Sequence, residues 1–156
     1  MGYTHYWSYD RDFDRRALGL ALLDAREIVK AVQARGISLR GGLGEGEPMV
    51  GEGICFNGNA SREEDHETFL FPMSTVGEEE SMEINGQPWD FCKTAEKPYD
   101  LAVCAVLLVL KHHLGSKLRV GSDGDSGDWQ QAVDLVKKLF GYDIEFVRED
   151  TVFVNA

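Results

Sequence analysis

The longest unbroken apolar run in the chain covers residues 101–110 and predicts a helix that is buried on every side. Asp100, directly before the run, can cap the first turn, and Pro98 keeps the residue before it out of helical geometry. Basic side chains complement the helix dipole at the other end, and Gly115 can close the last turn. We therefore expect a central helix over about residues 100–114.

Helical spacing of apolar residues predicts two further helices, one from near Phe13 to Gly36 and one over residues 129–140, ending at Gly141. In the first of them the spacing is carried by Ala17, Leu20, Ala21, Ile28, Ala31 and Val32. The candidate N-caps are Asp10 or Asp12 for this helix and Ser126 or Asp128 for the later one.

Alternating and β-rich segments predict strands around these helices, beginning with the aromatic-rich residues 1–9. The other candidate strands are residues 37–40, 50–57, 67–71, 81–85, 117–121, 143–148 and 151–154. Asn57 with Gly58 and Asn85 with Gly86 are turn signals. Strands mixed with separate helices, without regular alternation, indicate a single α+β domain in which a mainly antiparallel sheet packs against about three helices.

The chain carries 27 acidic and 16 basic residues, and the net charge of −11 limits what it can bind. Much of the acidic excess lies in residues 61–67 and 77–83. A surface this acidic repels phosphate backbones, which argues against direct nucleic-acid binding. The acids either keep the protein in solution or imitate a nucleic acid and occupy a basic groove of another protein.

Three observations predict a cytoplasmic protein without a membrane partner. The apolar run has ten residues, about half the length that a helix needs to cross a bilayer. The first residues carry aromatic and acidic side chains in place of the basic and then aliphatic segments of a signal peptide. Cys55, Cys92 and Cys104 are an odd number without paired spacing, which favours a reducing compartment, and Cys104 is expected to be a small core residue.

Lys93, Lys97 and Tyr99 form the first candidate ligand site. The two lysines are four residues apart and share a face if residues 92–97 form a helical turn, so they could hold a phosphorylated or nucleotide-like ligand beside the Tyr99 hydroxyl. The alternative is that the lysines balance neighbouring acids on a solvated loop. The sequence leaves open whether such a site would be catalytic.

Cys92 and three histidines supply candidate reactive groups. A Cys92 thiolate beside a lysine would be a nucleophile if a histidine lay close to it, and the alternative is a buried structural cysteine. His5 and Tyr6 could each contact a planar ligand, but alternation places them on opposite faces of the first strand, so at most one can belong to a given pocket. His112 and His113 are further candidates, although adjacent residues cannot ligate one metal as an i, i+4 pair does.

Asp123, Asp125 and Asp128 are the candidate metal ligands, because carboxylate oxygens suit a divalent cation. Their loop, residues 122–128, lacks the glycine offset and the closing glutamate of a calcium loop. The alternative is an ordinary turn with a helix cap. No other cofactor is expected.

Three segments, GYTHYW from Gly2, ICFNG from Ile54 and FCKTAEKPYDLAVCAVLLVLKHH from Phe91, resemble a family of small proteins encoded by tailed phages and prophages. With SDG at Ser122, the resemblance runs through nearly the whole chain. It implies a phage or prophage origin and carries over no catalytic residue. It also implies an inhibitor-like accessory protein that binds a host or defence protein, including mimicry of nucleic acid against CRISPR defences. The alternative is a small enzyme or sensor for a phosphorylated ligand.

Overall fold

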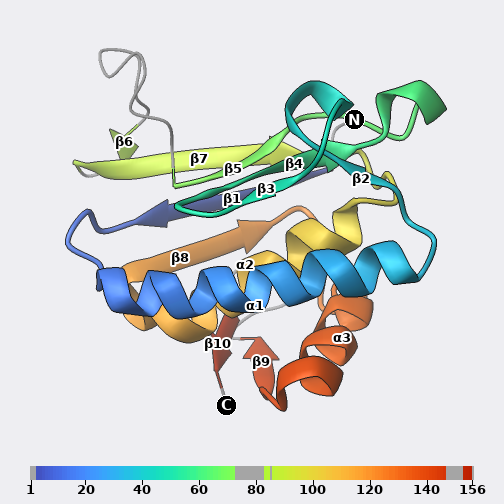
Figure 1. Ribbon diagram of the computed structural model, residues 1–156. Coiled ribbons are helices and arrows are strands. Elements are labelled where there is room, and N and C mark those ends of the chain that lie inside the picture. Colours follow the sequence, from blue (N-terminus) through green and yellow to red (C-terminus); the bar gives the residue numbers. More distant parts are fainter. Residues whose placement is uncertain (1–2, 73–82, 85, 147–152, 156) are drawn as a thin grey trace.

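A layer of antiparallel sheet covers two helices that pack against each other, so the chain has the expected α+β architecture (Figure 1). The computed structural model describes residues 3–72, 83–84, 86–146 and 153–155. The two helices are α1 (Arg15–Ala34) and α2 (Asp100–Leu114), and the third helix, α3 (Gln130–Phe140), packs against α2.

The sheets are antiparallel throughout. One sheet has the strand order β6 (Glu83–Ile84), β7 (Gln87–Lys93), β1 (Thr4–Tyr9) and β8 (Leu118–Ser122). The second is built on β4 (Ile54–Gly58), which pairs with β2 (Leu39–Arg40), β3 (Met49–Val50) and β5 (Phe69–Phe71). Near the end of the chain, β9 (Ile144–Phe146) pairs with β10 (Phe153–Asn155). Short 3₁₀ turns cover Gly42–Gly44, Ala60–Arg62 and Gly115–Lys117.

Helix α2 is enclosed on all sides. Residues 102–111 are all buried, as is Leu114, and α1, α3 and β8 pack around them. A helix without a polar face is stable only when every face is removed from water, so α2 forms the centre of the core. The predicted central helix is confirmed, and Gly115 closes it with a φ of 60°. Its N-cap is Tyr99, so Asp100 is the first helical residue and not the cap that the sequence predicted. Among the described residues, no helix combines the length and apolar content that crossing a bilayer needs.

Helix α1 begins and faces the core differently from the prediction. Its N-cap is Asp14, whose carboxylate accepts the backbone N–H of Arg16 at 2.9 Å. Asp10 and Asp12, the predicted caps, instead form ion pairs with Lys117 at 3.8 and 3.0 Å. The buried stripe consists of Leu18, Ala21, Ala25, Ile28, Val29 and Val32. Leu20, which the prediction placed on this stripe, has 48% of its surface exposed.

Aromatic rings join the two sheets. Trp7 and Tyr9 of β1 face the core, and their ring centroids lie 5.1 Å from Phe69 and 5.2 Å from Phe71 of β5. Phe56 of β4 continues the cluster at 5.3 Å from Phe69. Large rings in offset contact bury much apolar area, so β1 is held against both β5 and the helices.

Two local predictions were wrong, and in both cases contacts from distant parts of the chain decide the conformation. The helical turn over residues 92–97 that a shared face of Lys93 and Lys97 requires does not form, because residues up to Lys93 pair with β1 as strand β7. Asn57 and Gly58 lie inside β4 rather than in a turn. A Cβ at Gly58 would lie 2.1 Å from the carbonyl oxygen of Glu64, so this glycine serves close packing. Asn85 lies outside the described residues, and Gly86 follows β6 with a φ of 79°.

Asp90 makes folding stability depend on pH. Burial raises the pKa of its carboxyl to about 6, the Phe91 N–H opposes that rise, and Glu67 adds to it. Because this folded-state pKa exceeds the ordinary 3.8, the free energy of unfolding is highest below about pH 4, where the carboxyl is protonated. It falls as pH rises through 6 and the carboxyl ionises. We expect Asp90→Asn to match the wild type near pH 4 and to be about 1–2 kcal/mol more stable at pH 8, because the cost of ionising a half-buried acid is removed. Urea unfolding at both pH values measures the difference.

The exposed Asp134→Asn variant is the control for this pH dependence and should follow the wild type at both pH values. A stability difference between Asp90→Asn and the wild type that does not change with pH would contradict the prediction.

Candidate functional site

The sheet register brings His5 and Ser122 together. His5 of β1 pairs with Cys92 of β7 on one side and with Ser122 of β8 on the other. Paired residues of neighbouring strands point to the same face, so all three side chains face the core. The His5 ring is fully buried, and its Nδ1 lies 2.8 Å from the Ser122 hydroxyl oxygen.

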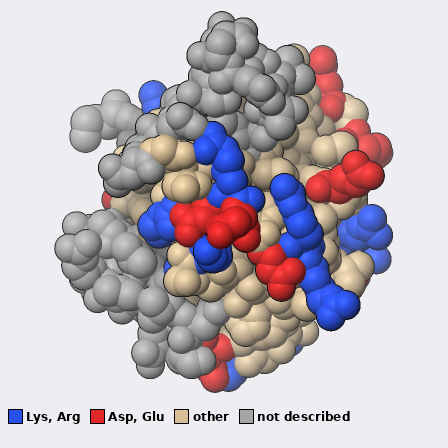
Figure 2. All heavy atoms as spheres, turned by 90° about the vertical axis from the view of Figure 1, so that its left-hand side faces the viewer, with Lys and Arg blue, Asp and Glu red and all other residues tan. Residues whose placement is uncertain are grey.

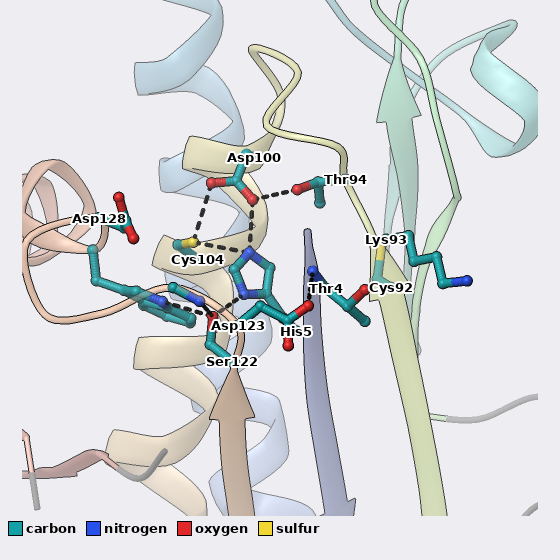
Figure 3. A network of polar contacts seen from close by, with 12 residues as sticks. Thr4, His5, Cys92, Lys93, Thr94, Asp100, Cys104, Ser122, Asp123 and Asp128 are labelled. Carbon is teal, nitrogen blue, oxygen red and sulfur yellow. Dashed lines mark hydrogen bonds and ion pairs between the residues drawn. The ribbon is translucent and has the colours of Figure 1, made fainter. Parts of the chain in front are cut away.

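The first residue of α2 supplies the partner on the other side of the His5 ring. His5 Nε2 lies 2.6 Å from Asp100 Oδ1, which also accepts the Thr94 hydroxyl at 2.5 Å. Cys104 is one helical turn further along α2, with its sulfur 3.5 Å from Asp100 Oδ2 and 3.4 Å from His5 Nε2. Figure 3 shows these side chains converging between β1, β8 and α2. Four separate segments therefore meet in one buried polar cluster.

Hydrogen-bond counting places the proton on the His5 ring. The Ser122 oxygen accepts the indole N–H of Trp129 at 3.1 Å and the backbone N–H of Gly124 at 2.9 Å. Neither of these groups can accept, so both lone pairs of Ser122 are used and its hydroxyl must donate to His5 Nδ1. The ring then carries its proton on Nε2 and donates it to Asp100. The direction of donation runs from Ser122 through His5 to Asp100.

Asp100 and Cys104 also line a pocket of about 470 Å³ between the start of α2 and α3. Tyr3, Glu96, Lys97 and Asp128 are further members of its wall. The fully buried His5 lies behind Asp100, so Asp100 connects the buried cluster with the pocket. This volume is in the range of small-molecule sites.

A strained turn forms one wall of the pocket. Ala95 and Glu96 have φ values of 52° and 58°, in the left-handed region that costs a residue with a side chain about 1–2 kcal/mol. The turn is held by the backbone N–H of Thr94, which donates to the Tyr3 carbonyl at 3.1 Å, and by that of Lys97, which donates to the Thr94 carbonyl at 3.0 Å. Such strain persists only where surrounding contacts impose it, and it is concentrated at binding sites.

The pocket is electrostatically negative. Its wall carries the carboxylates of Glu96, Asp100 and Asp128 and one cation, Lys97, whose ammonium donates to the Glu63 carbonyl at 3.1 Å. The negative charge also acts on the Tyr3 hydroxyl. Burial is the largest cause that raises the pKa of this phenol, and the charges of Asp100 and its neighbours raise it further. The wall is also tightly packed, since a Cβ at Gly124 would lie 2.2 Å from the Tyr3 oxygen.

The predicted anion site at Lys93, Lys97 and Tyr99 is not assembled. Lys97 lines the pocket, whereas Lys93 lies exposed on β7 with its ammonium 6.0 Å from the centre of the Phe91 ring. Tyr99 is fully buried and donates its hydroxyl to the Glu67 carbonyl at 2.5 Å. Burial also raises the pKa of Tyr99, so its hydroxyl is a structural donor.

Cys92, Tyr6 and the paired histidines lie outside the pocket wall. Cys92 is fully buried with its sulfur 3.4 Å from the Glu67 carbonyl, and burial, followed by Glu67, raises the pKa of the thiol. Tyr6 faces away from His5 and donates its hydroxyl to Asp123. His112 and His113 are at the opposite end of α2, where His112 stacks on Tyr142 at 3.6 Å and His113 contacts Asp24 at 2.8 Å. The structural reading of Cys92 is the one that fits.

The predicted metal ligands Asp123, Asp125 and Asp128 do not converge. Asp123 accepts the Thr4 N–H at 3.1 Å, while Asp125 and Asp128 accept each other's backbone N–H at 3.0 Å. These bonds shape the loop, and the N-cap residue of α3 is Trp129, not Ser126 or Asp128 as predicted. Over the described ranges, the group whose ligand atoms all lie within 4.8 Å of one another is His5, Asp100 and Cys104.

Sequence reasoning missed Asp100, Cys104, Ser122 and Tyr3 as parts of the site. The i, i+4 spacing of Asp100 and Cys104 was a usable signal, because it places both side chains on one face of the helix. Ser122 could not be found this way, since its place beside His5 depends on the register of β1 and β8.

Comparison with known proteins adds no further assignment. No family model, no curated protein and no solved structure matches this chain. The functional argument therefore depends on the geometry of the site.

The hydrogen-bond count predicts a single tautomer of His5. Long-range ¹H–¹⁵N correlation spectra at neutral pH should show the His5 proton on Nε2 alone, because Ser122 has no free lone pair for a second ring N–H. Ser122→Ala should keep the proton on Nε2, because Asp100 still accepts it, and should lower the free energy of unfolding by about 2–3 kcal/mol, because the buried Trp129 and Gly124 donors lose their acceptor. The exposed His66 serves as the reference resonance. A proton on Nδ1 in the wild type would contradict the assignment.

Proposed function

We propose that this chain binds a small amine-bearing ligand in the pocket between α2 and α3, with Asp100 as the group that receives the amine. The observation that carries the proposal is a carboxylate at the pocket wall whose position is set from behind by His5 and Thr94. Groups fixed before the ligand arrives need no reorganisation on binding, which favours both affinity and acid–base chemistry.

Charge selects the ligand class. Three carboxylates in the wall exceed the single lysine, and that lysine already donates to a carbonyl. At ~4 Å, a like charge costs about 1 kcal/mol in water and about 4 kcal/mol near a protein surface. A phosphorylated ligand would meet this repulsion from Asp100, Glu96 and Asp128, whereas an ammonium group would be attracted by the same side chains. The pocket therefore favours amines over the phosphorylated ligands expected from the sequence.

A thermal-shift comparison of two ligand sets tests this proposal. Amino sugars, polyamines and amino-acid amides form one set, and sugar phosphates with nucleotides form the other. We expect members of the amine set alone to raise the melting temperature, because binding to the folded state stabilises it. For the best ligand, Asp100→Asn should weaken binding by about 30-fold, or ~2 kcal/mol.

Two further variants make the test specific. Glu96→Gln at the exposed rim should weaken amine binding several-fold without disturbing the buried cluster, which covers the case in which Asp100→Asn fails to fold. Asp134→Asn lies on α3 but faces solvent and should bind as the wild type does. Stabilisation by the phosphate set, or equal amine binding by Glu96→Gln and the wild type, would count against the proposal.

A second candidate function is binding to a basic protein surface, as the phage resemblance implies. The observation that favours it is the net charge of −11 with a dense acidic segment at residues 61–67. On the face that Figure 2 shows, basic side chains surround the acidic ones, so this face is not uniformly acidic. Asp10, for example, pairs with Arg119 at 3.1 Å. Residues 61–67 are therefore the described segment best suited to such a partner.

Capture from bacterial lysate at moderate salt tests this second function. We expect a basic partner to be recovered, and Glu63→Lys with Glu64→Lys to reduce its recovery at least fivefold by reversing two charges. Glu27→Lys, an exposed reversal on α1, is the control. Equal recovery with both charge-reversed proteins would show that the acidic segment is not the binding surface.

A further inference from the structure

We propose that His5, Asp100 and Cys104 form a binding site for a divalent transition metal ion, best suited to Zn²⁺, whose fourth position opens into the pocket. No sequence motif indicates this metal site, because its ligands come from two distant segments, β1 and one face of α2. Imidazole, carboxylate and thiolate are the three ligand types that Zn²⁺ takes in proteins.

The distances fit a tetrahedral ion. Bonds of about 2.0–2.1 Å to nitrogen, about 2.0–2.2 Å to oxygen and about 2.3 Å to sulfur require ligand–ligand edges of about 3.3–3.6 Å. The Cys104 sulfur lies 3.4 Å from His5 Nε2 and 3.5 Å from Asp100 Oδ2, so two edges already have the required length. The present hydrogen bond at 2.6 Å from His5 Nε2 to Asp100 Oδ1 has to break, because Nε2 must lose its proton and turn its lone pair to the ion.

The surrounding groups support this ligand set. Ligation through Asp100 Oδ2 leaves Oδ1 to the Thr94 hydroxyl, which already holds it at 2.5 Å. The second nitrogen of His5 lies 2.8 Å from Ser122, in the position of the oxygen that usually orients a metal-bound imidazole. Figure 3 shows Thr94 and Ser122 on opposite sides of the cluster, so Thr94 supports Asp100 and Ser122 supports His5.

Metal binding changes the positions of two protons and the hydrogen bonds of Ser122. Binding releases the Cys104 thiol proton to solvent and moves the His5 proton from Nε2 to Nδ1, so the Ser122 hydroxyl must turn away from the ring. Ser122 has only two lone pairs, so either the Gly124 N–H or the Trp129 indole N–H must give up its bond to Ser122, which weakens the site relative to one with a carbonyl acceptor. In return, the cluster of one neutral imidazole, two anions and one divalent cation is neutral, as a buried site requires.

Three protein ligands and one open position are the arrangement of catalytic zinc sites. Asp100 and Cys104 line the pocket, so a water molecule or a ligand nitrogen can complete the coordination. This part deepens the proposed function and rests on it, because the amine would release its proton to solvent and bind the ion through its nitrogen lone pair, in place of pairing with Asp100 as an ammonium group. Metal binding itself is independent of any organic ligand.

Metal titration of the whole chain tests the site. Protein freed of metal with EDTA should take up one Zn²⁺ per chain in competition with a chromophoric chelator. Co²⁺ in the same site should give thiolate-to-cobalt charge transfer and intense tetrahedral d–d bands. Cys104→Ser should remove the charge-transfer band and weaken Zn²⁺ binding roughly 100-fold, and Thr94→Val should weaken it roughly 10-fold through loss of the supporting bond. Cys55→Ser, at a cysteine outside the cluster, should leave both readings unchanged.

The result that would overturn the site is Zn²⁺ uptake below one per chain, or equal affinity in Cys104→Ser and the wild type. If Cys104→Ser does not fold, the Co²⁺ spectrum of the wild type still decides, because octahedral bands without charge transfer exclude the thiolate ligand. Amine binding measured in EDTA separates the two proposals, since it can succeed when the metal titration fails.

Discussion

The complete burial of α2 is the constraint on which the rest of the structure depends. The helix presents apolar side chains in every direction, so sheet, α1 and α3 all have to cover it. Asp100 is the exception at its first position. A carboxylate there needs donors because it is taken largely out of water, and His5, Thr94 and Cys104 supply them. The polar cluster is thus a consequence of how the core is built, and the pocket forms where the cover ends.

Local signals predicted the parts of the fold that depend on local chemistry. The apolar run with Pro98 before it and Gly115 after it determined α2 correctly, because these residues restrict the backbone wherever they occur. The predicted cap of α1 was wrong because several aspartates near its start can cap, and Asp10 and Asp12 pair with the distant Lys117 instead. The N-caps of α2 and α3 are Tyr99 and Trp129, which cap preferences do not favour. Strand β7 was missed because its pairing with β1 connects residues more than 80 positions apart.

The sequence predicted individual residues of the candidate site but not which of them lie together. His5 belongs to the buried cluster and Lys97 to the pocket wall, whereas Lys93 and Tyr99, close to Lys97 in sequence, do not line the pocket. Neighbours in sequence were expected to act together, yet a strand turns successive side chains to opposite faces and a tight turn separates them further. The distant residues that contact His5, among them Asp100, Ser122 and Trp129, come from positions 100 to 129, so their arrangement follows from register and packing.

The left-handed pair at Ala95 and Glu96 has a consequence for how this chain could change. Asparagine and glycine adopt such geometry with little strain, so a sequence selected for stability alone would carry them at these positions. The turn instead has an alanine and a glutamate beside the pocket, and their left-handed geometry lowers the stability of the fold. A variant with relaxed backbone there would melt at a higher temperature while losing the charged rim, so thermostability and the proposed selectivity for amines would evolve in opposite directions at this one turn.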